Sequence, residues 1–236
     1  MSRLIKEDFN KLCGFIRSYG IEAVVDNKES LGLLSAYHKK YLAYLVLVEN
    51  LRLHAGEGIQ ESFIPQSQYD FLQESCSDVG QAFFLMFHGC YKGSKLLLRS
   101  SIENFLKFIG LDECPGLPAT KSVSEIFDKT KAISVFAGNK VNLHSILHDD
   151  YATLCQDVHT ADKTHMASIS ALSHFPNFSV DEASAITKMA QRLVSIYVTV
   201  LALKYNQIYH SQNFLHKEVC NETIVKEFKK DVHNIK

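Results

Sequence analysis

Apolar positions along the chain recur mostly at the spacing of α-helices, and sustained alternation of apolar and polar residues is absent. The segment 28–54 is the clearest case, with apolar side chains at intervals of three, four and seven residues. They are Leu34, Tyr37, Tyr41, Tyr44, Leu45 and Val48. Such a stripe is typical of a helix with one buried face. The pattern predicts an all-α protein, a helical bundle of about seven to eight helices with short connections.

Capping residues, glycines and prolines set the expected helix boundaries. Ser122 with Glu125, and Ser179 with Glu182, have the spacing of capping boxes that begin helices. Glycines weaken the segment 67–109, which is either two helices or one helix with close neighbours at its glycines. The helices are expected at 5–19, 28–54, 67–109, 122–136, 141–158, 162–174, 179–210 and 213–232.

One domain covering residues 1–236 accounts for this arrangement. We expect an N-terminal helical lobe, 1–64, to pack on a core of helices, 67–210, with a C-terminal helix at 213–233. The stretch 114–118, Cys-Pro-Gly-Leu-Pro, is the clearest loop. We interpret it as a connection within the domain.

Composition narrows the class of protein further. The chain has 236 residues, of which 46% are hydrophobic and 22% charged, as in ordinary globular proteins. Intrinsic disorder, collagen-like repeats and a disulfide miniprotein are excluded. Twenty-five basic residues against 26 acidic ones argue against non-specific coating of nucleic acid, which needs many contacts to phosphate. A small local basic patch stays compatible with this balance.

Cysteine spacing and the lack of long apolar runs suggest where the protein works. The six cysteines form no CxxC pair, and the N-terminus is charged without an apolar stretch, so we expect reduced thiols and a cytoplasmic protein. The longest apolar runs, 41–48 and 193–203, are shorter than the ~20 residues that span a membrane. We interpret them as buried helix and expect no membrane segment and no cofactor.

Candidate chemistry begins with Arg99 and Glu103, which are four residues apart on one expected helix. Arg before Glu is the weaker orientation for an isolated helical pair, so surface stabilisation explains them poorly. One interpretation is a partly buried ion pair that holds two helices in register. The other is a pair that faces a pocket and acts with a residue from another helix. Both flank the apolar stripe Leu98, Ile102, Phe105 and Ile109.

His159 is the best candidate for that further residue. Positions 151, 154, 155, 158 and 159 form one helical stripe, so His159 is expected to point inward at the end of its helix. It is either a histidine of the core or a general acid–base whose pKa depends on burial and on Glu103 or Asp157.

These two segments together resemble HEPN-like helical proteins, and among them bacterial members from phage-defence and abortive-infection loci. The resemblance rests on Tyr91-x7-Arg99-x3-Glu103 followed by Tyr151-x2-Leu154-Cys155-x2-Val158-His159, and covers about 81–165. It implies a helical bundle, usually dimeric. It also implies, for many members, a metal-independent ribonuclease whose Arg-x4–6-His motifs from both subunits line a shared cleft. His159 would match the catalytic histidine.

The chain departs from the family pattern at the arginine. No arginine is followed by a histidine five to seven residues later, so the usual motif is missing. Either Arg99 replaces it from a neighbouring helix, holding phosphate while His159 moves the proton of the 2′-hydroxyl, or the protein is a non-catalytic relative. The catalytic candidates are Arg99, Glu103 and His159, and the binding candidates are Tyr151, Asp157 and Lys95.

A histidine pair offers a competing chemistry. His144 and His148 are one helical turn apart, a spacing that suits a shared metal, and Asp149 and Asp150 follow directly. The other interpretation is an ordinary exposed helix face, and no metal is expected.

Two functions follow from these residues and the resemblance. The first is an effector or toxin-type protein of a bacterial defence or stress system, acting on RNA as a metal-independent ribonuclease and a homodimer. The alternative is a non-catalytic binding or adaptor subunit that contacts another protein of such a system.

Overall fold

The computed structural model describes residues 2–56, 64–156 and 176–234. In these ranges the regular structure is helical, and β-pairing is limited to an isolated bridge between Ala55 and Ile64. The predicted all-α class is therefore confirmed.

Eleven α-helices, more than the expected seven to eight, lie in the described ranges, because short helices join the long ones at both ends of the chain. Short 3-10 turns at 134–136, 138–140 and 226–228 connect some of them. The helices are α1 Arg3–Ser18, α2 Glu22–Asp26, α3 Lys28–Arg52, α4 Gln66–Phe87, α5 Tyr91–Gly110, α6 Val123–Thr130, α7 Val141–Gln156, α8 Val180–Lys204, α9 Asn206–Ser211, α10 Phe214–Asn221 and α11 Lys229–His233.

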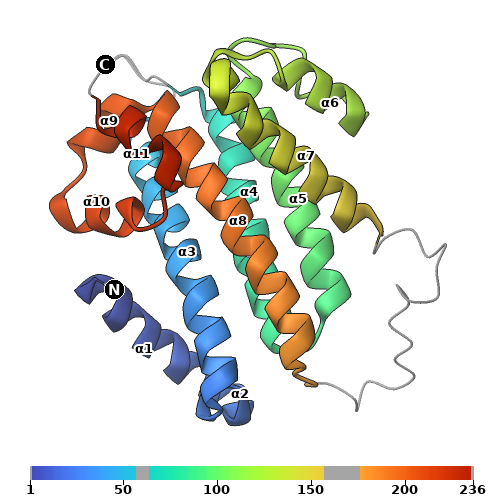
Figure 1. Cartoon of the computed structure of the whole chain (residues 1–236), viewed down its shortest axis with the longest axis vertical. Coiled ribbons are helices and arrows are strands. Elements are labelled where there is room, and N and C mark those ends of the chain that lie inside the picture. Colours follow the sequence, from blue (N-terminus) through green and yellow to red (C-terminus); the bar gives the residue numbers. More distant parts are fainter. Residues whose placement is uncertain (1, 57–63, 157–175, 235–236) are drawn as a thin grey trace.

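Four long helices, α3, α4, α5 and α8, lie side by side and form the bundle (Figure 1). The neighbours α4 and α5 are antiparallel, and α3 packs along α8. The helices α1 and α2 cover the outer side of α3, whereas α7 lies against α5 on the opposite side. The short helices α9, α10 and α11 gather at the end of the bundle where α8 ends.

A satisfied chain of hydroxyl groups crosses the centre of the bundle. Tyr44 of α3 donates to Ser75 of α4 at 2.9 Å, and Ser75 donates to the carbonyl of Ser101 on α5 at 2.9 Å. The Ser101 hydroxyl in turn lies 3.0 Å from the phenol of Tyr197 on α8. All four side chains are buried, and one hydrophobic cluster surrounds them from Ile5 to Val232. The described residues within 1–64 therefore share their core with the rest of the described chain.

The helix α8 is the central apolar element. It is the helix in the described part that is long and apolar enough to cross a membrane, and 67% of its most apolar window is buried inside the bundle. Burial on this scale is typical of the core helix of a bundle. Its buried and exposed positions do not alternate every second residue, as they would in a strand.

The segment 67–109 forms two helices, and Gly89 marks the break between them. Its φ of +82° lies in the left-handed region, which an L-residue with a side chain rarely adopts. A Cβ at this position would meet the backbone oxygen of Asn177 at 2.2 Å. The alternative of one continuous helix is wrong, although a close approach does occur at Gly80 within α4, where a Cβ would lie 2.5 Å from the Tyr41 hydroxyl.

Three predicted helix ends are wrong, and hydrogen bonds accompany two of them, a local one at Thr130 and a tertiary one at Val225. The helix that begins after Ser122 ends at Thr130 instead of 136, where the buried Thr130 hydroxyl bonds the carbonyls of Ile126 and Phe127. The predicted C-terminal helix is interrupted after Asn221, and the extended Val225 donates its N–H to Thr199 of α8.

The third misplaced end is that of α8, which stops at Lys204 although 179–210 was predicted as one helix. Tyr205 leaves the helical region with φ −106° and ψ 48°, and α9 then continues in a new direction. The short helix α2 was not predicted either. The predicted helix 162–174 lies outside the described residues.

Candidate functional site

Three of the predicted site residues meet between α5 and α7. Arg99 of α5 donates to the phenol oxygen of Tyr151 on α7 from Nε at 2.9 Å and from Nη2 at 2.7 Å. The same phenol donates to Glu103 Oε1 at 2.9 Å. Arg99 Nη2 lies 3.5 Å from that carboxylate oxygen. We call these three residues the Arg99 cluster.

Helical geometry explains why the Arg99 cluster forms. Arg99 and Glu103 are one turn apart on α5, so their side chains leave the helix on the same face. Tyr151 projects from the neighbouring α7 and places its hydroxyl between the cation and the anion. The phenol hydrogen is used on Glu103, and the lone pairs of its oxygen accept from Arg99. Each polar atom involved thus has a partner of complementary chemistry.

The Arg99 cluster is partly accessible to solvent. The side chains of Arg99 and Glu103 are 27% and 28% exposed, and Tyr151 is half-buried. Burial raises the pKa of the Tyr151 phenol well above its usual value, and the Glu103 charge raises it further, while the Arg99 hydrogen bond opposes the shift. The phenol is therefore protonated near neutral pH and stays a donor to Glu103. The sequence left open whether Arg99 and Glu103 form a structural ion pair or a pocket site, and their partial burial is compatible with both.

A second group of polar side chains lies on the other flank of α5. Asp78 of α4 is 3% exposed and accepts a hydrogen bond from Asn104 Nδ2 at 3.0 Å. Burial raises the pKa of Asp78, and its Ser100 and Asn104 hydrogen bonds oppose that shift. The sequence analysis missed Asp78. Its signal was a carboxylate on the apolar stripe of its helix, beside the buried positions Ser75, Val79 and Ala82.

Lys95, a predicted binding residue, is oriented differently from Arg99. It lies one turn before Arg99 on α5, but its ammonium group is 3.5 Å from Glu182 of α8. The predicted catalytic His159 and the predicted binding residue Asp157 lie outside the described residues, just beyond the end of α7. Whether His159 completes a site with Arg99 stays a prediction.

The two histidines of the alternative metal site have unlike surroundings. His144 is buried beside the rings of Phe127 and Phe136, and its Nε2 lies 3.0 Å from the hydroxyl of Thr130. That hydroxyl also donates to the carbonyl oxygen of Ile126 at 2.8 Å. His148 is exposed. In the described ranges, no group of three or more His, Cys, Asp or Glu side chains is placed to hold a metal.

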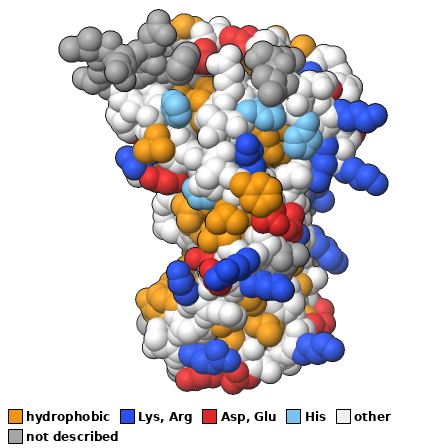
Figure 2. Space-filling model, turned by 90° about the vertical axis from the view of Figure 1, so that its left-hand side faces the viewer, with side chains coloured by type: hydrophobic (Ala, Val, Ile, Leu, Met, Phe, Trp, Pro, Cys, Tyr) orange, Lys and Arg blue, Asp and Glu red, His pale blue; other side chains and the backbone are white. Residues whose placement is uncertain are grey.

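The face of the protein shown in Figure 2 has no continuous basic surface among its described residues. On this face, which lies on the left of Figure 1, Lys and Arg side chains are interspersed with acidic and apolar ones. Strong non-specific binding of nucleic acid would need a field of one sign. A nucleic-acid contact on this face would therefore be local.

Comparison with known proteins adds no relative. No protein-family model matches the chain, and no curated protein or solved structure matches it significantly. The fold and the Arg99 cluster define an all-α bundle with a partly accessible Arg–Tyr–Glu arrangement between two of its helices.

Proposed function

We propose that the protein is a metal-independent ribonuclease, an effector of a bacterial defence or stress system that acts on RNA as a homodimer. The observation that carries the proposal is the position of Arg99, which is partly exposed and fixed from two of its nitrogens by Tyr151. A planar guanidinium held in one orientation is suited to phosphate, which it can bind with two parallel hydrogen bonds. The resemblance described above supplies the substrate class.

The charge of Arg99 is only partly offset in the Arg99 cluster. Charge-assisted N–H···O bonds between ionised groups are usually about 2.7–2.9 Å long. The Arg99–Glu103 separation of 3.5 Å is longer, and the phenol of Tyr151 makes the closer contacts to both. Arg99 is thus oriented chiefly by a neutral oxygen, which leaves its positive charge able to attract an anion.

The proposed reaction needs one base, one acid and one cation. His159 takes the proton of the ribose 2′-hydroxyl, whose oxygen attacks phosphorus. The bond from phosphorus to the 5′-oxygen breaks, this oxygen receives a proton from water acting as the acid, and His159 returns its proton to the solvent. The products are a 2′,3′-cyclic phosphate and a 5′-hydroxyl. Arg99 binds the non-bridging oxygens as negative charge accumulates on them. Glu103, through Tyr151, keeps Arg99 in place and acts as a positioning residue.

The test is cleavage of total RNA in EDTA by the wild-type protein and by Arg99→Ala, Arg99→Lys and His159→Ala variants. We expect cleavage by the wild type and a loss of about 100-fold or more in Arg99→Ala and His159→Ala, the range for removing a general acid–base or a charge-stabilising group. Arg99→Lys restores the charge without the paired donors and should stay impaired. Sedimentation of the same samples tests the homodimer.

Arg52→Ala is the matched control. Arg52 is also an α-helical arginine paired with a glutamate, Glu49, but both side chains are more than half exposed on α3. Its loss should leave cleavage unchanged. Cleavage that survives in Arg99→Ala and in His159→Ala would refute the proposed site, as would activity that is abolished by EDTA.

A non-catalytic binding or adaptor subunit is the second candidate function. It is favoured by the complementary bonding within the Arg99 cluster, which is also what an ion pair holding α5 against α7 would require. If it is correct, wild-type protein will not cleave RNA under any condition, and Arg99→Ala will lower the thermal midpoint. Affinity purification of the full chain from its native host should then recover one partner in stoichiometric amount, with cleavage absent from the complex too.

A further inference from the structure

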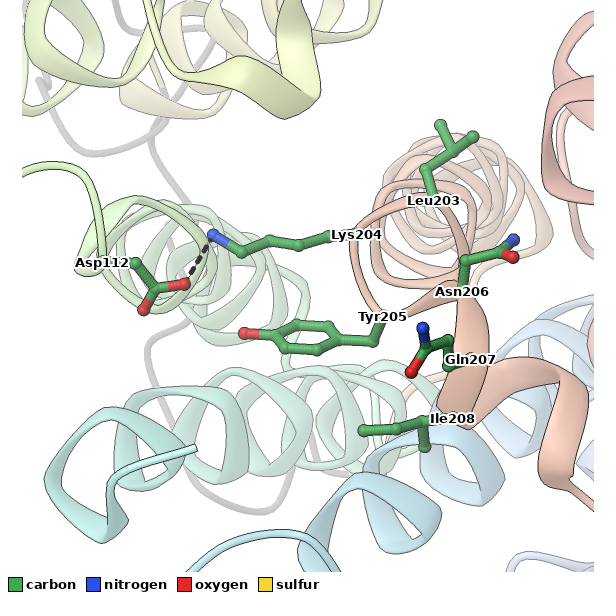
Figure 3. A pocket seen from close by; sticks show the side chains of 7 residues that line it. All are labelled: Asp112, Leu203, Lys204, Tyr205, Asn206, Gln207 and Ile208. Atoms are coloured by element: carbon green, nitrogen blue, oxygen red, sulfur yellow. Dashed lines mark ion pairs between the residues drawn. The ribbon is translucent and has the colours of Figure 1, made fainter. Parts of the chain in front are cut away.

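A hollow of about 390 Å³ lies at the end of the bundle where α8 turns into α9 (Figure 3). This volume lies within the range of small-molecule sites. The hollow lies at the break of α8, and residues on both sides of Tyr205 line it. Its lining combines apolar and hydrogen-bonding groups: Asp112, Leu203, Lys204, Tyr205, Asn206, Gln207 and Ile208.

An ion pair fixes one wall of the hollow. Lys204 Nζ lies 3.0 Å from Asp112 Oδ2 and donates to the carbonyl oxygen of Ile109 at 2.7 Å. The Lys204 side chain is only 13% exposed, while Asp112 is 46% exposed. Figure 3 shows the aliphatic stem of Lys204 extending over the ring of Tyr205 toward Asp112. The wall thus presents a fixed donor and a fixed acceptor side by side.

The hydroxyl of Tyr205 is the unusual group of this site. It is buried, and within the described part of the chain no protein group hydrogen-bonds to it. Leaving a buried hydroxyl unpaired is energetically unfavourable. Few buried polar groups in native proteins lack a hydrogen-bond partner, so each such group calls for an explanation. Burial raises the pKa of the Tyr205 phenol, with a further contribution from Asp112, so the group is neutral and can donate or accept.

A second hollow of about 260 Å³ adjoins the first and shares Leu203, Lys204 and Asn206 with it. Its own lining residues come from the 3-10 turns and from α11, and they are polar for the most part: Ser134, Val135, Lys140 and Asp231. Across both hollows, two lysines are balanced by two aspartates. A strongly charged ligand gains little from such a site, whereas a ligand rich in hydrogen bonds gains more.

We infer that the two hollows form a binding site for a nucleoside or its monophosphate. The first hollow suits a planar base, with the aromatic Tyr205 and the apolar Ile208 against its face. The Lys204 donor, the Asp112 acceptor and the exposed amide of Gln207 are available to its polar edge. The second hollow suits the sugar, whose hydroxyls match the Asp231 carboxylate and the Ser134 hydroxyl oxygen, which donates its own hydrogen to Glu113 at 2.7 Å, and it holds Lys140 for a phosphate.

This site is separate from the Arg99 cluster. Arg99 lies in the middle of α5, whereas Asp112 follows the end of α5, thirteen residues along the chain. The inference therefore goes beyond the ribonuclease proposal, and a binding measurement tests it without reference to RNA cleavage.

The experiment is calorimetric titration of the full chain with adenosine, guanosine, cytidine and uridine, and then with their 5′-monophosphates. We expect saturable binding of at least one nucleoside. Equal affinity for nucleoside and monophosphate would identify the free nucleoside as the ligand. Tighter binding of the monophosphate, lost in Lys140→Met, would identify the nucleotide. Failure of all eight probes to bind at millimolar concentration would overturn the inference.

Tyr205→Phe is the decisive variant because it removes only the unpaired hydroxyl. We expect its thermal midpoint to be unchanged or higher and its affinity for the bound probe to fall about 3- to 10-fold, the equivalent of one hydrogen bond. Gln207→Ala, at an exposed position, should also weaken binding. Tyr19→Phe, directly after the distant α1, is the control and should bind as the wild type does. Unchanged affinity in both Tyr205→Phe and Gln207→Ala would refute the site.

Discussion

The guanidinium of Arg99 donates two hydrogen bonds to the phenol oxygen of Tyr151, at 2.9 Å from Nε and 2.7 Å from Nη2. These residues are 52 positions apart and join the middle of α5 to α7. The contact makes Tyr151 the link between Arg99 and Glu103, although those two lie on one helix. The Arg–Glu pair is thus better described as an Arg–Tyr–Glu arrangement across two helices.

Tyr151→Phe should lower the free energy of unfolding by about 1–2 kcal/mol. The substitution keeps the ring but removes the oxygen that bonds both Arg99 and Glu103, and a hydrogen bond to a charged group contributes about 1.5–3 kcal/mol when buried. We reduce this figure because the cluster is partly exposed. Urea denaturation measures the change. Tyr19→Phe, on an exposed side chain, is the control, and equal stability of the two variants would show that the phenol does not link the helices.

Arg192→Leu should destabilise the fold more than substitution of an arginine whose carboxylate partner is exposed. Asp150 of α7 is buried, and Arg192 of α8 binds both of its carboxylate oxygens. Removing Arg192 leaves a buried carboxylate uncompensated, which costs about 3–5 kcal/mol when both partners are buried. Because the Arg192 side chain is 49% exposed, we expect about 2–3 kcal/mol.

The control for Arg192 is Arg52→Ala, whose exposed ion pair should contribute less than about 1 kcal/mol. The double variant Arg192→Leu with Asp150→Asn should be less destabilised than Arg192→Leu alone, because Asp150→Asn removes the buried charge. A double variant at least as unstable as Arg192→Leu would contradict this account.

Stability should fall between pH 6.5 and 4 through His144. Burial, with smaller contributions from His148 and Lys131, lowers the pKa of His144 from 6.5 to about 4. In that interval the unfolded chain binds a proton that the folded chain does not, so the stabilisation present above pH 6.5 is progressively lost as pH falls toward 4. The shift corresponds to at most about 3 kcal/mol.

Comparison of the wild type with His144→Phe isolates this contribution, because other titrating groups are common to both proteins. Urea midpoints of the wild type should drop more steeply with falling pH than those of the variant. Parallel pH profiles would show that His144 is not the group responsible. The variant retains an aromatic ring beside Phe127 and Phe136, and Thr130 keeps its bond to the Ile126 carbonyl.

Gly89→Ala should disrupt the turn between α4 and α5. The residue has a positive φ, and a Cβ would lie 2.2 Å from a backbone oxygen that cannot rotate away. Backbone strain of this kind alone costs about 1–3 kcal/mol. Gly116→Ala is the matched control, because that glycine has ordinary φ and no atom within 4 Å of an added Cβ. Thermal midpoints measure both, and similar midpoints would exclude a special role for Gly89.

Local signals located the beginnings of helices correctly. The hydroxyls of Ser122 and Ser179 accept from the N–H groups of Glu125 and Glu182, as their spacing predicted. The required atoms lie within three residues of one another, so the sequence contains the whole interaction. The ends were harder to predict, because the α8 break at Tyr205 has no glycine or proline to mark it.

The sequence predicted some residues of the candidate site and missed others. Arg99 and Glu103 were recognisable because a charged pair on an apolar helix is unusual, and Tyr151 was named from a second motif. The hydrogen-bonding geometry of these three residues could not be predicted from the sequence, because it depends on how α7 lies against α5. Asp78, Tyr205 and the hollow beside Lys204 were not foreseen, since each is defined by residues from different helices.

The sequence by itself determined the all-α class, the approximate positions of the long helices, and the capped starts of α6 and α8, because helical periodicity and capping act over a few neighbouring residues. Only the tertiary structure decided where α8 bends, how the C-terminal segment divides at Val225, and which oxygen orients Arg99. The last two of these features involve contacts between residues 26 and 52 positions apart, and their energies exist only once the helices have packed.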